Sequence, residues 1–95
     1  MSLAFEWDED KAASNRKKHR VSFEEAASVF ADPLAAIFDD EGHSEEEQRE
    51  IIIGRSVADR ILLVCFTERA GAIRIISARG ATPRERRDYE ENPGR

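Results

Sequence analysis

Basic and aromatic side chains gather near the start of the chain in a pattern that could handle a phosphate. Residues 11–21 carry five Lys and Arg residues and no acid. A helix over this segment would place several polar side chains on one face, because successive residues turn by about 100°. These are Lys11, Asn15, Lys18 and His19. Trp7, just before them, could stack on an unpaired base, an interaction of about 1–3 kcal/mol per base.

These residue types suit the cleavage of RNA without a metal ion. The 2′-hydroxyl of RNA can attack the neighbouring phosphate, so a protein has to orient the strand, transfer protons and stabilise charge. Arginine binds phosphates through a fixed fork of donors, and Arg74, Arg79 and Arg86 are candidates. Arg74 and Arg79 are five residues apart, so they serve one cleft only if a bulge intervenes or one lies past the strand end.

Structural roles compete with these functional ones. Trp7 could belong to the core, which is the common place for a tryptophan. His19 could only favour the negative end of a helix dipole. Arg86 could make ion pairs along its helix, which contribute little.

The pattern predicts neither a metal site nor a cofactor. The two histidines, His19 and His43, are far apart in the sequence, Cys65 is the single cysteine, and no ligand spacing is present. The acidic residues 39–47 lack the regular spacing of a calcium loop. No glycine-rich phosphate loop occurs.

Charge is segregated along the 95 residues, which we expect to form a single domain over 1–95. The net charge is −5, and residues 22–59 carry eleven acids and two bases. A globally acidic protein is a poor generic binder of nucleic acid. The basic segments 11–21 and 69–95 could nevertheless form a local positive cleft if the fold brings them together.

We expect a cytoplasmic protein. No apolar run approaches the roughly 20 residues of a membrane span, and no secretory signal is recognisable. Cys65 lies in an apolar run and cannot belong to a disulfide framework, which fits a reducing compartment.

Capping signals and hydrophobic runs predict an α+β fold. Residues 3–7 read as a strand, Asp8 can cap a helix, and Ser22 with Glu25 opens a second helix that ends before Pro33. Four apolar runs read as strands, at 34–38, 50–54, 60–67 and 72–79. Thr82 with Glu85 opens a last helix that reaches about residue 92. Tight turns favour an antiparallel sheet, and we expect all helices to cover one of its faces.

Several motifs together resemble the BrnT-type toxins of bacterial type II toxin–antitoxin pairs. They are "FEWD", Lys11, Asn15, "KH" at 18–19, "VSFEEA", Phe30 with "DP" at 32–33, "FTER", "RIISAR" and "RERRDYE". The resemblance runs in order from Phe5 to about Glu91. It implies a RelE-like fold: an antiparallel sheet with two N-terminal helices and one C-terminal helix, in the order strand, helix, helix, four strands, helix.

The resemblance also implies an activity and a set of site residues. The activity is an endoribonuclease that halts translation, with RNA as substrate and the ribosome as a further partner. The catalytic residues would be Lys11, His19, Arg69 and Arg79. We expect the RNA to contact Trp7, Lys18, Arg74 and Arg86.

The implied protein partner is a cognate ribbon-helix-helix antitoxin, whose dimer forms a heterotetramer with the toxin and connects it to operator DNA. We expect acidic antitoxin residues to cover the positive segments. The alternative function is a non-catalytic antitoxin-binding module or corepressor derived from such a toxin. Growth arrest on induction of the chain alone would separate the two.

Overall fold

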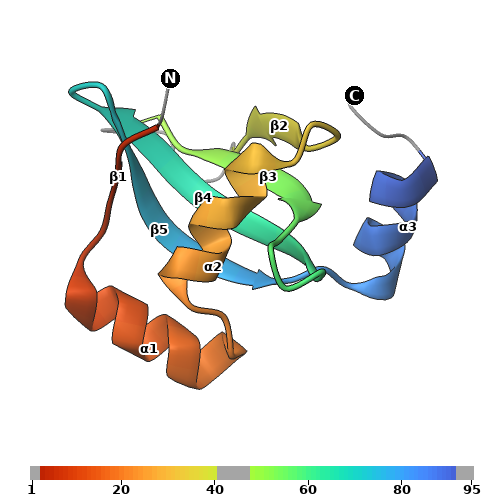
Figure 1. Ribbon diagram of the computed structural model, residues 1–95, viewed down its shortest axis with the longest axis horizontal. Helices are drawn as coiled ribbons and strands as arrows, with labels where there is room; N and C mark the ends of the chain where they lie inside the picture. Colours follow the sequence, from red (N-terminus) through yellow and green to blue (C-terminus); the bar gives the residue numbers. More distant parts are fainter. Residues whose placement is uncertain (1–2, 41–47, 92–95) are drawn as a thin grey trace.

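A five-stranded sheet forms the centre of the protein in the computed structural model, which describes residues 3–40 and 48–91 (Figure 1). The sheet order is β1-β5-β4-β3-β2. The strands are β1 (Phe5–Glu6), β2 (Ala36–Asp39), β3 (Glu50–Arg55), β4 (Ile61–Arg69) and β5 (Ala72–Gly80). β1 runs parallel to β5, and every other neighbouring pair is antiparallel. The predicted α+β fold with an antiparallel sheet is confirmed.

Side-chain caps define the ends of the helices, as the sequence predicts. The helices are α1 (Glu9–His19), α2 (Phe23–Ser28), the 3-10 turn η1 (Val29–Ala31) and α3 (Pro83–Glu91). The Asp8 carboxylate accepts the amides of Asp10 and Lys11. Thr82 and Glu85 form a reciprocal capping box, in which each side chain accepts the backbone amide of the other.

The helices cover both faces of the sheet, which corrects the prediction that they cover one. α1 and α2 pack against one face around Phe23, Leu62 and Ile75. α3 stands apart from them in Figure 1 and places Tyr89 against Ile53 and Leu63 on the other face. Tyr89 anchors α3, and the direction of the chain after β5 decides which face of the sheet it reaches.

A bulge in β5 puts two arginines on the same face. Arg79 lies opposite Leu63 and Arg74 lies opposite Thr67, while the register shifts by one residue between them at Ile76. Directly opposite residues of an antiparallel pair point to the same side, and Leu63 and Thr67 are four apart on a regular strand. The structure therefore contains a bulge between Arg74 and Arg79, one of the two conditions under which both arginines could face the same side of the sheet.

Asn15 explains why the very polar helix α1 is held against the sheet. Its side-chain amide donates to the carbonyl of Ala78 at 2.9 Å and accepts the amide of Ala78 at 3.1 Å. It also donates to the carbonyl of Val21. Asn15 is buried. It pairs with the backbone amide and carbonyl of β5 at a position that the short β1 does not reach. The sequence places Asn15 on the polar face of the helix with Lys11 and His19, but these contacts give it a structural role.

Candidate active site

A polar hollow of about 230 Å³ lies where the end of α1 meets the face of the sheet that α3 also covers. Its charged and polar lining residues come from five elements or their ends. They are His19, Asp40, Arg49, Cys65, Ser77 and Arg79. Two arginines and a histidine face one carboxylate, so the hollow suits an anion that must be held while protons move.

Each element of the site is fixed by local structure. His19 is the last residue of α1, and Asn15 one turn earlier anchors that helix to β5. Asp40 and Arg49 flank the segment between β2 and β3 and are joined by a backbone hydrogen bond of 3.0 Å, from the amide of Asp40 to the carbonyl of Arg49. Arg79 extends from the regular part of β5 beyond the bulge.

Arg79 already has a carboxylate partner. Its two terminal nitrogens donate to the two oxygens of Glu85 in α3, at 2.8 and 2.9 Å. The hydrogen bonds from Arg79 are the main reason why the pKa of Glu85 is lowered to about 2, from an ordinary value of 4.5. The guanidinium is therefore held in a fixed orientation by the same bidentate geometry with which arginine binds a phosphate.

Asp40 and Cys65 meet on the floor of the hollow. The Cys65 thiol donates to Oδ2 of Asp40 over 3.7 Å. This contact holds the carboxylate next to the thiol within the hollow that the two arginines also line. Cys65 is partly buried.

The structure brings only two of the predicted site residues into the hollow, His19 and Arg79. Lys11 is exposed in the first turn of α1, about 12 Å along the helix axis from His19. Arg69 ends β4, about 20 Å along the strand from Leu63, the residue opposite Arg79. Lys18 is exposed on α1 and does not line the hollow.

The remaining predicted residues also lie outside the hollow. Trp7 packs edge-to-face on Phe23, with ring centres 5.9 Å apart, on the opposite side of the sheet. Arg74 shares its sheet face with Arg79 but forms an ion pair of 3.0 Å with Glu6. Arg86 lines a separate hollow at the start of α3.

The sequence does not single out Asp40 and Arg49, because Asp40 belongs to the acidic residues 39–47, which read as a solvated loop, and Arg49 follows them closely. The acidic residues 41–47 themselves, with His43, lie outside the described residues. A usable signal was present, since Arg49 is one of two bases among the eleven acids of residues 22–59. A base retained directly before an apolar strand is a candidate for a site at that end of the strand.

Neither a metal cluster nor a membrane helix occurs within residues 3–40 and 48–91. No three His, Cys, Asp or Glu side chains in these ranges gather in a way that could hold a metal ion. None of the helices in the same ranges is both long enough and apolar enough to cross a bilayer.

Comparison with known proteins identifies a family and a similar solved structure. The family model described as "Ribonuclease toxin, BrnT, of type II toxin-antitoxin system" matches residues 7–85. The fold is similar to the crystal structure of the Brucella abortus ribonuclease toxin BrnT, with a TM-score of 0.65 and 25% sequence identity. That match covers 85% of this chain and 99% of the other. No curated protein sequence matches the chain significantly.

Proposed function

Because the chain belongs to the BrnT ribonuclease toxins of type II toxin–antitoxin systems, we propose that it cleaves RNA in the hollow between His19 and Arg79. It does so in the cytoplasm without a metal ion, and the cleavage inhibits translation. A cognate antitoxin neutralises it. The observation that carries this proposal is that His19, Asp40, Arg49 and Arg79 line one hollow although they are far apart in the sequence.

The chemistry is an internal transfer at phosphorus. The 2′-oxygen of one nucleotide forms a bond to the adjacent phosphorus, the bond from phosphorus to the 5′-oxygen breaks, and a 2′,3′-cyclic phosphate and a 5′-hydroxyl result. One group removes the proton from the 2′-hydroxyl, and another protonates the 5′-oxygen. His19 and Asp40 are the two groups proposed for these transfers.

Arg79 and Arg49 stabilise the charge that builds on the phosphate oxygens. Interactions that strengthen in the transition state raise the rate, and removing one such donor typically costs about 10²–10³ in rate. Arg79 can serve only when its fork turns from Glu85 to the phosphate. The phosphate would take the place of the Glu85 carboxylate as the bidentate partner of Arg79, so little reorganisation of the guanidinium is needed.

The predicted site residues that lie outside the hollow are still proposed to contribute to RNA binding or catalysis. Lys18, Arg74 and Arg86 would contact the RNA on either side of the cleaved bond. The resemblance alone supports catalytic roles for Lys11 and Arg69 and a stacking role for Trp7, and these stay predictions. The antitoxin would be a ribbon-helix-helix dimer that binds operator DNA in a heterotetramer with the toxin.

Induction of the chain in bacteria tests the proposal. The chain alone should arrest growth, and co-expression of the neighbouring gene should relieve the arrest. A His19→Ala, Arg79→Ala double variant should be harmless at the same expression level. If the wild-type chain is harmless but still binds the product of the neighbouring gene, the alternative function of a non-catalytic binding module is the correct one.

A further inference from the structure

The outer edge of β2 combines an unpaired strand with exposed apolar side chains. β2 ends the sheet, and no strand among the described residues pairs with its other side. The side chains of Ile37 and Phe38 are large and apolar and remain 52% and 48% exposed. Edge strands of this kind invite pairing with another chain unless something covers them.

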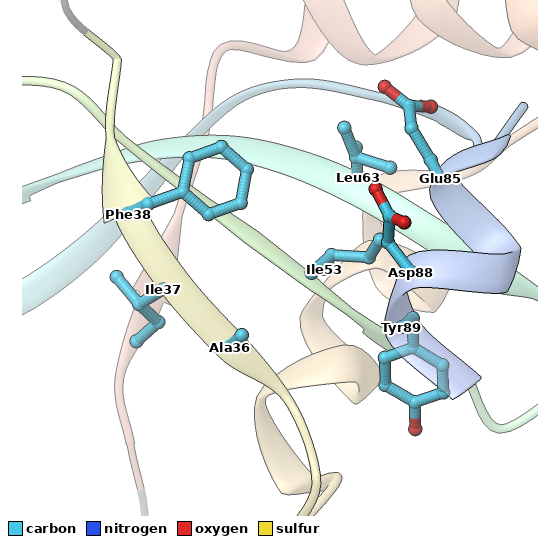
Figure 2. Close-up of a pocket in the computed structure, with 8 residues that line it drawn as sticks. All are labelled: Ala36, Ile37, Phe38, Ile53, Leu63, Glu85, Asp88 and Tyr89. Carbon is cyan, nitrogen blue, oxygen red and sulfur yellow. The ribbon is translucent and has the colours of Figure 1, made fainter. Parts of the chain in front are cut away.

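An apolar groove of about 410 Å³ lies on one side of this edge, between β2 and α3. Figure 2 shows Ile53 and Leu63 between the two elements, with Phe38 projecting from β2 towards α3. Asp88 and Tyr89 line it from α3. The groove is thus open to a side chain that enters beside Phe38.

A second hollow, of about 370 Å³, lies on the opposite side of β2. Ile37 reaches it, since Figure 2 shows Ile37 and Phe38 pointing to opposite sides of the strand. Its apolar lining includes Phe30, Ile52 and Phe66. Two hollows on opposite sides of one edge match the alternation of side chains along an added strand.

The charges around both hollows are negative. Asp88 lines the groove together with Glu85, which Arg79 already binds, and Asp32, Glu50 and Glu68 line the second hollow. Among the described residues, no Lys, Arg or His lines either of them. In addition, Asp39 and Glu50 lie directly opposite each other in the pair β2–β3, an arrangement of like charges that is unfavourable without a nearby cation.

We infer that the cognate antitoxin adds an extended segment to the outer edge of β2 as a sixth strand, with apolar side chains entering the two hollows and lysines or arginines meeting the acids around them. The inference rests on the proposed function, because that function supplies the partner. It differs from the sequence-based expectation that acidic antitoxin residues cover the positive segments. A second copy of this chain is the wrong occupant, since antiparallel self-pairing would bring two acidic edges together.

Backbone geometry specifies which amides an added strand would use. The Asp40 amide donates to Arg49 of β3, so alternation along an antiparallel strand turns the amides of Phe38 and Ala36 towards β3 as well. The amides of Ile37 and Asp39 point outwards. A proline at position 37 therefore removes an outward donor and leaves the pairing of β2 with β3 intact.

The test measures binding of the purified antitoxin, encoded beside this gene, to the full chain. Ile37→Pro should weaken Kd at least about tenfold beyond Ile37→Ala, because both lose the side chain and only proline loses the amide. Phe38→Lys should weaken it at least about tenfold by placing a cation against a basic segment. Val57→Lys is the matched control, since Val57 is 83% exposed and lines neither hollow. Thermal unfolding verifies that each variant is folded.

Three outcomes would overturn the inference. Equal binding by Ile37→Pro and Ile37→Ala would exclude strand addition. Normal binding by Phe38→Lys, with binding lost in Lys17→Glu, would move the partner to the positive surface. A wild-type dimer that Phe38→Lys dissociates, with antitoxin binding unchanged, would make the edge a contact between copies. RNA cleavage is measured in parallel, because a chain that binds through β2 but cleaves no RNA would refute the proposed function alone.

Discussion

The polar hollow and the apolar groove lie on the same face of the sheet, and Leu63 lines both. They differ in charge, because the hollow gathers His19, Arg49 and Arg79 around a single acid, Asp40, whereas the charged residues of the groove, Glu85 and Asp88, are both acidic. A phosphate backbone is attracted to the first and repelled by the second. The proposed RNA site of this acidic protein therefore depends on the sign of the local charge more than on the net charge.

The two regions meet at Glu85. Its carboxylate binds Arg79 of the hollow, and its side chain also lines the groove. A change to Glu85 or Arg79 can therefore affect both regions, whereas a change to a residue that lines only one of them should leave the other intact.

The largest effect is expected for His19. His19→Ala should lower the rate of RNA cleavage by about 10²–10⁴, since a positioned proton-transfer group contributes that much. Antitoxin binding at β2 should stay unchanged, because His19 lies only in the hollow. The cleavage rate is measured with the purified variant on a defined RNA, and antitoxin binding is measured by titration. Unaltered cleavage would remove His19 from the site.

Arg79→Ala should cost about 10²–10³ in the cleavage rate, the usual effect of losing one charge-stabilising donor. Arg79→Lys should recover only part of this loss, because lysine keeps the charge but not the fork. Arg84→Ala, an exposed arginine of α3 outside both regions, is the matched control. If the Arg84 variant lost as much activity as the Arg79 variant, general attraction of RNA would explain the result.

Gly54→Ala should disturb the β2 side of the molecule by crowding the chain just before β2. An added Cβ would lie 2.9 Å from Cβ of Ala35 and 3.0 Å from Val29 Cγ1. We expect the free energy of unfolding to fall by about 1–3 kcal/mol, the typical cost of overpacking. Chemical denaturation measures this. An unchanged stability would mean that Ala35 can move away, and that β2 is less firmly placed than described.

The smallest effect is expected for Glu85→Gln, and it appears at acid pH. The pKa of Glu85 is lowered from 4.5 to about 2 in the folded protein, chiefly by Arg79. The pair therefore stabilises the fold fully above about pH 4.5, and this contribution is lost as the pH falls towards 2. Between pH 6 and pH 3, the Tm of the wild-type protein should therefore fall further than the Tm of the Glu85→Gln variant. An equal loss in both proteins would show that the ion pair contributes no stability.

Local signals explain why most of the fold could be predicted from the sequence. Asp8, Ser22 and Thr82 each accept a backbone amide at the start of a helix, as expected for capping residues. The bulge at Ile76 and the position of α3 could not be predicted with the same certainty. Both depend on how distant segments pack together, and no local pattern encodes that.

The candidate site could be predicted only in part, because local signals identify some of its residues and the packing of distant segments brings in the others. His19 belongs to a helix that Asp8 caps, and Arg79 belongs to an apolar strand, so the elements that carry them could be predicted from the sequence. Asp40 and Arg49 lie at strand ends next to a polar segment, and only the pairing of β2 with β3 brings them to the hollow. Trp7 was assigned to RNA although its contact with Phe23 favours the core alternative.

Cleavage of a long RNA by the purified wild-type chain in the presence of EDTA tests the central claim most directly. We expect the rate to be the same with and without EDTA, and the fragments to end in 2′,3′-cyclic phosphates and begin with 5′-hydroxyls. The His19→Ala protein serves as the control for contaminating ribonucleases. Cleavage that stops in EDTA, or fragments that end in 3′-hydroxyls, would contradict the proposed transfer by the residues of the hollow.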